Sequence, residues 1–222
     1  MMIRPLNPYS LSFPNPRFAS DEGLLAYGGD LSYNRLLSAY RSGIFPWYNK
    51  EDPILWWSPN PRMVLYLNDF KISKNLAKTI KKEIFEIKFD TNFRAVVENC
   101  KNITRNYTDH TWIQEEIVEA YCTLFDEGIA HSFEAYYNNE LVGGGYGLVI
   151  GDIFCGESMF ALKTDASKVA LYHLIEHLKK KDFRLIDCQV PSEHLESLGA
   201  SIISRDQFLD TLKIALEDPK EF

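Results

Sequence analysis

The stretch GIFPWYNKEDPILWWSPNPR, residues 43–62, constrains the fold more than any other part of this chain. It holds three of the four tryptophans and four of the ten prolines within twenty residues. Each proline ring locks its own φ angle and removes a hydrogen-bond donor, so we predict that the segment forms neither helix nor strand. A proline-stiffened loop holds Trp47, Trp56 and Trp57 in fixed positions at little entropic cost. Such a loop is suited to form a wall against which a flat or apolar group lies.

Composition argues against several classes of protein. The 222 residues are 45% hydrophobic and 25% charged, the balance of a globular chain with one large domain or a small domain beside a larger one. The first ten residues lack the apolar core of a secretory signal, and no apolar run is long enough to span a membrane. The four cysteines are widely spaced, which indicates reduced thiols in a cytoplasmic protein. A net charge of −7 restricts any nucleic-acid partner to a local basic patch.

Hydrophobic periodicity predicts an α+β fold. We expect helices over about 32–42, 71–83, 91–100, 111–128, 165–181 and 205–216, and strands over 62–68, 85–90, 131–137, 141–150, 152–162 and 184–190. Tight turns join the three strands after residue 130 into an antiparallel meander. The order helix, meander, helix, strand suits a GNAT-like (acyl-CoA N-acyltransferase-like) core, and we expect a domain boundary near residues 60–70.

A basic stripe follows one side of the helix predicted over 71–83. Apolar residues recur every four positions at Ile72, Leu76 and Ile80. The opposite side carries the lysines of the stripe, which are Lys71, Lys74, Lys78, Lys81 and Lys82. A solvated helix face is the ordinary explanation, but so many lysines in an acidic protein favour contact with an RNA backbone.

Two polar side chains interrupt the apolar stretch LIDCQV, residues 185–190. The period of two in a strand puts Asp187 and Gln189 on one face and Cys188 on the other. A buried carboxylate is costly unless it is paired. The two side chains therefore belong either to a structural hydrogen-bond network or to a polar pair positioned at a reaction centre.

Three further features have both a structural and a functional interpretation. HLIEH, residues 173–177, matches a zinc-peptidase pattern, but no third ligand follows it, so we predict no metal site. VGGGYG, residues 142–147, fits no phosphate-binding loop, and glycines within a strand favour a close approach of other atoms. Glu157 stands between apolar neighbours, where it either has a structural partner or binds a cationic group.

The motifs of the chain, taken together, resemble those of a known family. They are FP at 13–14, GLLAYGGDL, AYRSGIFPWY, PILWWSPNPR, TWI, AHSFE, LVGG, GESMF, ASKVAL, LIDCQ and SLGA. They occur in the order found in leucyl/phenylalanyl-tRNA–protein transferases, and the resemblance runs from about Phe13 to Phe208. It implies a small N-terminal α/β domain, residues 1–62, packed on a GNAT-like catalytic domain, residues 63–222, without metal or coenzyme.

The resemblance also implies an activity. It is the transfer of Leu or Phe, and less well Met, from aminoacyl-tRNA to proteins that begin with Arg or Lys, which marks them for degradation through the N-end rule. Trp47 and Trp112 are then expected to line the adenosine and aminoacyl site, and Phe154 and Met159 the apolar pocket. Trp56 and Trp57 either add to this site or pack the domain junction.

The expected reaction assigns roles to the polar residues. Gln189 accepts a hydrogen bond from the attacking amine or donates one to the oxyanion, and Asp187 orients and polarises it. Because an amide is too weak a base to hold a proton, we favour positioning over proton abstraction. Glu157 is expected to receive the cationic side chain of the acceptor, and the basic stripe is expected to contact the tRNA.

Two rival functions explain less of the sequence. A coenzyme-A-dependent N-acyltransferase of the GNAT type requires a glycine-rich pyrophosphate loop after the central strand, and FALKTDASK, residues 160–168, lacks it. A non-enzymatic RNA-binding module would use the tryptophan loop and the basic stripe. It would leave Asp187 and Gln189 without a role.

Overall fold

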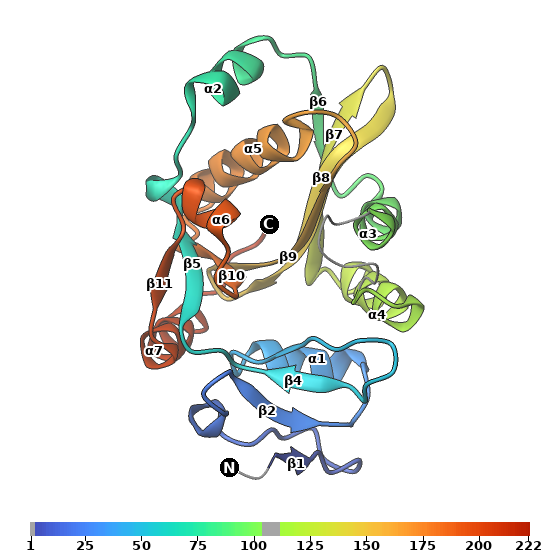
Figure 1. The fold of residues 1–222 in the computed structure, drawn as a ribbon, viewed down its shortest axis with the longest axis vertical. Helices are drawn as coiled ribbons and strands as arrows, with labels where there is room; N and C mark the ends of the chain where they lie inside the picture. The colour runs from blue at the N-terminus through green and yellow to red at the C-terminus, as the bar shows by residue number, and fades with distance from the viewer. Residues whose placement is uncertain (1–2, 104–111) are drawn as a thin grey trace.

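The protein consists of two β-sheets with helices packed around them (Figure 1). The structure is a computed structural model, and it describes residues 3–103 and 112–222. The described residues form a four-stranded and a seven-stranded sheet, so the predicted mixed α+β class is confirmed. The predicted division at residues 62 and 63 stays a prediction; it falls at the first residue of β5 (Arg62–Tyr66), a strand of the larger sheet.

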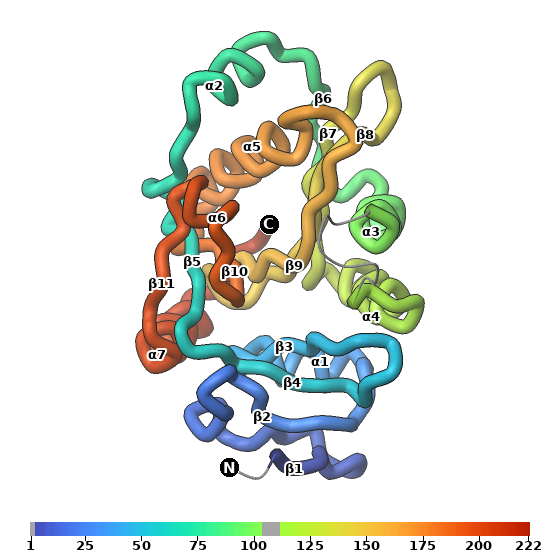
Figure 2. Tube along the Cα trace, in the orientation of Figure 1, coloured from blue at the N-terminus to red at the C-terminus, as the bar shows by residue number. Residues whose placement is uncertain are grey.

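The smaller sheet is built entirely from the N-terminal part of the chain. Its strands, in sheet order, are β1 (Arg4–Pro5), β2 (Leu24–Tyr27), β4 (Leu55–Trp57) and β3 (Phe45–Pro46). Helix α1 (Tyr33–Tyr40) runs beside β3 and β4 (Figure 2). This helix confirms the prediction over 32–42, and Gly43 follows it with the positive φ of 72° that glycine adopts freely.

The prediction that residues 43–62 contain no strand was wrong. Strands β3 and β4 both lie in this segment. They form because the prolines avoid the ladder: Pro46 ends the edge strand β3, Pro53 precedes β4, and Pro59 and Pro61 follow it. Proline is tolerated at sheet edges and strand ends, where its missing N–H leaves no partner unpaired.

The larger sheet carries the predicted meander. Its strands, in sheet order, are β11 (Ser201–Ile203), β5 (Arg62–Tyr66), β10 (Leu185–Gln189), β9 (Ile153–Ala161), β8 (Glu140–Ile150), β7 (Ala130–Tyr137) and β6 (Glu86–Phe89). Strands β7, β8 and β9 pair antiparallel, as predicted, whereas β10 pairs parallel to β9. The short strand β11 at the edge was not predicted.

Helices cover both faces of the larger sheet. The α-helices of the described residues, besides α1, are α2 (Lys74–Lys81), α3 (Phe93–Asn102), α4 (Glu115–Asp126), α5 (Ala166–Lys180), α6 (Glu193–Ser197) and α7 (Arg205–Ala215). Helix α5 lies against one face, and α3 and α4 lie against the other (Figure 1). Within 3–103 and 112–222, no helix combines the length and apolar character needed to cross a membrane.

Several helix ends differ from the prediction: α3, for example, was predicted over 91–100 and spans Phe93–Asn102. The prediction for α4 began at residue 111, which lies outside the described residues. Helix α2 is shorter than predicted, because the Ser73 hydroxyl accepts a hydrogen bond from the Leu76 N–H at 3.1 Å and starts the helix there. Ile72 therefore precedes the helix and is exposed rather than part of its apolar side.

The glycines of strand β8 allow close packing, as predicted. A Cβ atom at Gly143 would lie 2.6 Å from Cβ of Ala166 at the start of α5. At Gly145 it would lie 2.6 Å from the ring of Phe133. Both distances are too short for real atoms, so a side chain at either position would push α5 or the Phe133 ring away from the sheet.

Candidate active site

The site begins where two parallel strands separate. Strands β9 and β10 are paired up to Cys155 and Asp187, and each becomes irregular directly afterwards. In β9 the pairing skips Glu157, because Gly147 faces Gly156 while Tyr146 faces Ser158. In β10 the register shifts before Gln189, which has a left-handed φ of 65°. Bulges of this kind re-aim side chains, and here they turn them toward a cavity.

That cavity has a volume of about 480 Å3, within the range of about 300–1,000 Å3 that small-molecule sites occupy. It lies between the larger sheet, helices α5 and α6, and the segment after β3. The predicted site residues that line it are Trp47, Trp112, Phe154, Glu157, Met159 and Gln189. The structure thus brings together predicted residues from four separate parts of the sequence.

The predicted alternation of side chains in LIDCQV was wrong at its end. Cys188 and Gln189 both line the cavity, whereas Asp187 does not. The irregular register before Gln189 ends the period of two, so its side chain turns to the same side as that of Cys188. Asp187 still contacts Gln189, as predicted, but through the main chain: the Gln189 N–H donates to Asp187 Oδ1 at 3.0 Å.

Asp187 is held by an arginine that sequence reasoning missed. Arg62 at the start of β5 donates to both carboxylate oxygens of Asp187, at 2.8 and 2.6 Å, and both side chains are buried. Arg62 also donates to the Gly43 carbonyl at 3.2 Å and lies over the rings of Phe45 and Phe208. The sequence does hold a signal for this pair: Arg62 directly precedes the apolar run MVLY, so it is expected to be buried, and a buried charge needs a partner of opposite sign.

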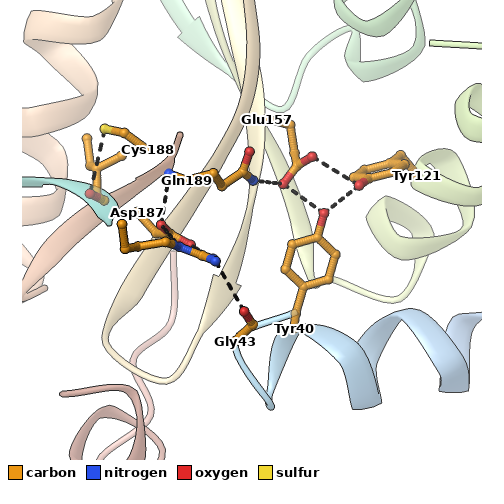
Figure 3. A network of polar contacts seen from close by, with 9 residues as sticks. Tyr40, Gly43, Tyr121, Glu157, Asp187, Cys188 and Gln189 are labelled. Carbon is orange, nitrogen blue, oxygen red and sulfur yellow. Dashed lines mark hydrogen bonds and ion pairs between the residues drawn. The ribbon is translucent and has the colours of Figure 1, made fainter. Parts of the chain in front are cut away.

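Glu157 is the centre of a second polar cluster (Figure 3). Its Oε1 accepts from the Tyr40 hydroxyl and from Gln189 Nε2, both at 2.8 Å, and its Oε2 accepts from the Tyr121 hydroxyl at 3.0 Å. Burial raises the pKa of Glu157 to about 7, although these three donors lower it. No sequence pattern singled out Tyr40 or Tyr121, because each lies on the buried side of an ordinary amphipathic helix.

The three clustered tryptophans have different structural roles. Trp47 is 44% exposed at the cavity, and the Trp57 ring lies 5.7 Å from it. Trp57 Nε1 donates to the Trp47 carbonyl at 2.6 Å, which fixes the backbone that carries the exposed ring. Trp56 is fully buried and packs edge-to-face on Phe13, so it belongs to the core rather than to the wall.

The basic stripe lies away from the cavity. Helix α2 is at the end of the molecule opposite the smaller sheet (Figure 1). All five lysines of the stripe are exposed, and none of them forms an ion pair with another described residue. Their positive charge is therefore available to an outside partner.

The HLIEH motif has a packing role in the structure. The His177 ring lies 4.8 Å from Phe89 and 4.9 Å from Phe222, and burial lowers the pKa of His177. Among the described residues, no three His, Cys, Asp or Glu side chains gather as metal ligands.

The thiol beside Gln189 is a poor nucleophile. Burial first, and the nearby Asp187 charge second, raise the pKa of Cys188 well above its usual range. Gln189 and Glu157 are among the other polar groups that line the cavity, and neither an amide nor a hydrogen-bonded carboxylate is a strong nucleophile. Such a site suits a transferase that joins an activated acyl group directly to an amine.

Comparison with known proteins identifies this class more closely. The sequence profile described as "Leucyl/phenylalanyl-tRNA protein transferase" matches residues 64–213, and that of its N-terminal domain matches residues 29–60. The leucyl/phenylalanyl-tRNA–protein transferase of Sulfurimonas denitrificans is 57% identical over 95% of this chain and 92% of its own length. That of Cellvibrio japonicus is 50% identical over 100% of this chain and 94% of its own.

The chain belongs to the leucyl/phenylalanyl-tRNA–protein transferase family and is an aminoacyltransferase. The resemblance seen in the sequence motifs is thereby confirmed. A solved structure of a functionally unknown conserved protein from Staphylococcus epidermidis aligns with a TM-score of 0.42 and 9% identity, over 82% of this chain and 68% of that one. A likeness this weak carries no information about function.

Proposed function

We propose that the cavity binds the aminoacylated 3′ end of a tRNA and transfers Leu or Phe, and less well Met, to proteins that begin with Arg or Lys. The observation that carries this proposal is the Gln189–Glu157 pair at the wall of a cavity with apolar lining and an exposed tryptophan. The new N-terminal residue then marks the acceptor for N-end-rule degradation in the cytoplasm.

The donor is bound by aromatic and apolar side chains. The flat adenine stacks on Trp47 and Trp112, and such stacking contributes roughly 1–3 kcal/mol per base. Phe154 and Met159 contact the Leu or Phe side chain. A hydrophobic pocket separates side chains that differ by one methylene by only about 1–3 kcal/mol, so the enzyme accepts several apolar amino acids.

The chemical step needs little more than positioning. The acceptor's α-amine has a pKa near 7.7–8.0, so a useful fraction is neutral at physiological pH. Its nitrogen attacks the ester carbonyl of the donor, the bond to the ribose oxygen breaks, and a proton passes from the amine toward that oxygen. Gln189 holds the amine through its carbonyl oxygen Oε1, because its Nε2 donates to Glu157. Asp187 supports this geometry by accepting from the Gln189 main-chain N–H.

Glu157 has a second role, toward the acceptor. Its carboxylate lies at the cavity, in the bulge of β9. In its ionised form it offers negative charge to the guanidinium or ammonium group of the acceptor's first residue. This role supports the proposed preference for Arg and Lys.

The order of elements supports a GNAT-like catalytic domain over residues 63–222. Helix α4, the meander β7–β9, helix α5 and the parallel strand β10 follow one another as in that fold. Residues 1–62 make up the proposed small α/β domain, with α1 and the smaller sheet.

We further propose that the basic stripe contacts the tRNA acceptor stem. The double substitution Lys74→Glu and Lys78→Glu is expected to raise KM for aminoacyl-tRNA by about tenfold or more, and to flatten its log–log salt dependence by about two units. Transfer from a short aminoacyl-adenosine, which cannot reach α2, should not change. Lys213→Glu on α7 serves as the control, since it also reverses an exposed lysine. Equal losses with both donors would show that the stripe is structural.

Transfer of labelled Leu from Leu-tRNA to an Arg-initiated peptide tests the function directly. We expect transfer to Arg- and Lys-initiated peptides and none to a Glu-initiated peptide of the same length. Acetyl-CoA as the donor tests the rival GNAT activity. Acetylation of the peptide without aminoacyl transfer would overturn the proposal.

A further inference from the structure

Two tyrosines from different parts of the chain meet at one carboxylate. Tyr40 ends helix α1 beside the smaller sheet, and Tyr121 lies in helix α4 on the larger one. Both are at most 3% exposed, and their hydroxyl oxygens are 2.5 Å apart. Tyr40 Oη lies 2.8 Å from Oε1 of Glu157 and Tyr121 Oη lies 3.0 Å from Oε2, and because the two hydroxyls are also hydrogen-bonded to each other, their two protons serve three contacts (Figure 3). A buried tyrosine hydroxyl needs one hydrogen-bond partner, so their convergence on the same group is more than burial requires.

This arrangement decides which end of the Gln189 amide faces Glu157. A carboxylate can only accept hydrogen bonds, so Gln189 must present its NH2 group to it, at 2.8 Å. The carbonyl oxygen Oε1 then faces the substrate. If Glu157 were protonated, its OH could donate to Oε1, and the amide would be free to turn its NH2 group toward the amine instead.

We propose that Tyr40 and Tyr121 are positioning residues: their hydrogen bonds favour the ionised, accepting form of Glu157, which directs the Gln189 carbonyl oxygen toward the attacking amine. The inference rests on the proposed role of Gln189 and extends it to two residues that do not touch the substrate. Both phenols remain donors throughout the physiological range, because burial first and the Glu157 charge second raise their pKa well above the ordinary value.

The proposal has a signature in the pH dependence. Tyr40, Tyr121 and Gln189 are hydrogen-bonded to Glu157, and the charge of Asp187, which is paired with Arg62, raises its pKa. The buried Cys155 thiol also lies near Glu157, and burial raises the pKa of that thiol. Removing a phenol hydroxyl takes a donor from the carboxylate, so the pKa of Glu157 rises above about 7. The protonated, misdirecting form then persists to higher pH.

The test compares Tyr40→Phe and Tyr121→Phe with the unmodified enzyme between pH 6 and pH 9. The acceptor amine ionises in every assay, so it cancels from the ratio of variant to unmodified kcat. We expect this ratio to fall about tenfold at pH 6 for each unit by which the pKa of Glu157 rises, and to recover toward pH 9. KM for aminoacyl-tRNA should not change. A ratio that is low but independent of pH would mean that the tyrosines are only structural.

Tyr48→Phe is a matched control. Tyr48 also donates its hydroxyl to a glutamate of α4, Glu116, but neither residue touches Gln189. This variant should keep the unmodified pH profile, and thermal unfolding monitored by circular dichroism checks that all variants fold. A pH-dependent loss in Tyr48→Phe would overturn the assignment.

A Gln189→Ala background separates this inference from the proposed function. There the tyrosine substitutions should have almost no further effect, because they act through Gln189. If Gln189→Ala is impaired and Tyr121→Phe still lowers kcat by its full factor, the positioning role is wrong while the proposed function stands. If Gln189→Ala is fully active, the proposed mechanism itself fails.

Discussion

Replacing Arg62 by methionine is expected to lower the free energy of unfolding by about 3–5 kcal/mol, one of the two largest effects that the structure implies. The substitution removes both charged hydrogen bonds to Asp187 and leaves a buried carboxylate without a cationic partner, although it still accepts from the Gln189 N–H. Urea denaturation measures the loss as a lower midpoint.

Arg205→Met is the control for this experiment. Arg205 is also buried, but its guanidinium donates to the main-chain carbonyls of Ser20 and Ser58, so its removal strands no charge. Adding Asp187→Asn to Arg62→Met should recover part of the lost stability, because the unpaired carboxylate becomes neutral. Equal losses for the two arginines, with no recovery, would mean that the ion pair contributes nothing specific.

The second large effect concerns activity. Gln189→Ala should lower kcat by about a hundredfold or more, which corresponds to roughly 2.7 kcal/mol of transition-state stabilisation. Asp187→Ala should have a similar effect, and the double variant should be little worse, because Asp187 acts through Gln189. Single-turnover assays with folding-checked variants measure these effects.

Cys188→Ser is the matched control for Gln189→Ala, because both side chains line the cavity. It should keep most of the activity, and no aminoacyl-thioester should accumulate, since the raised pKa keeps the thiol protonated. An inactive Cys188→Ser enzyme with a trapped covalent intermediate would contradict the positioning mechanism in favour of a cysteine nucleophile.

Local periodicity was enough to predict most of the larger sheet. The meander β7–β9 and helices α1 and α5 follow from patterns within single segments, which depend little on the rest of the chain. The tertiary pairing of Arg62 with Asp187 joins residues 125 positions apart, and no local pattern encodes such a contact. The partnership of Tyr40 with Glu157 is hidden for the same reason.

Several of the predicted site residues meet at one cavity, but the sequence did not predict their geometry, and their roles stay a prediction. Residues such as Trp47, Phe154 and Gln189 came from the motifs, and the structure places them around one cavity. Their orientations could not be predicted, because a period of two assumes a regular strand. The bulges at Glu157 and Gln189 break that period, and they depend on where neighbouring strands stop pairing.

The N-terminal part of the chain contributes Trp47 to a cavity built mostly on the larger sheet, and Tyr40 as a hydrogen-bond partner of Glu157 at its wall. Neither part of the chain can therefore hold a complete site by itself. Any local opening that separates α1 from α4 removes a donor from Glu157 and a wall from the cavity before the larger sheet unfolds. With the proposed site, activity requires the two parts to be joined, and we expect a partly unfolded or proteolytically nicked molecule to be inactive rather than less specific.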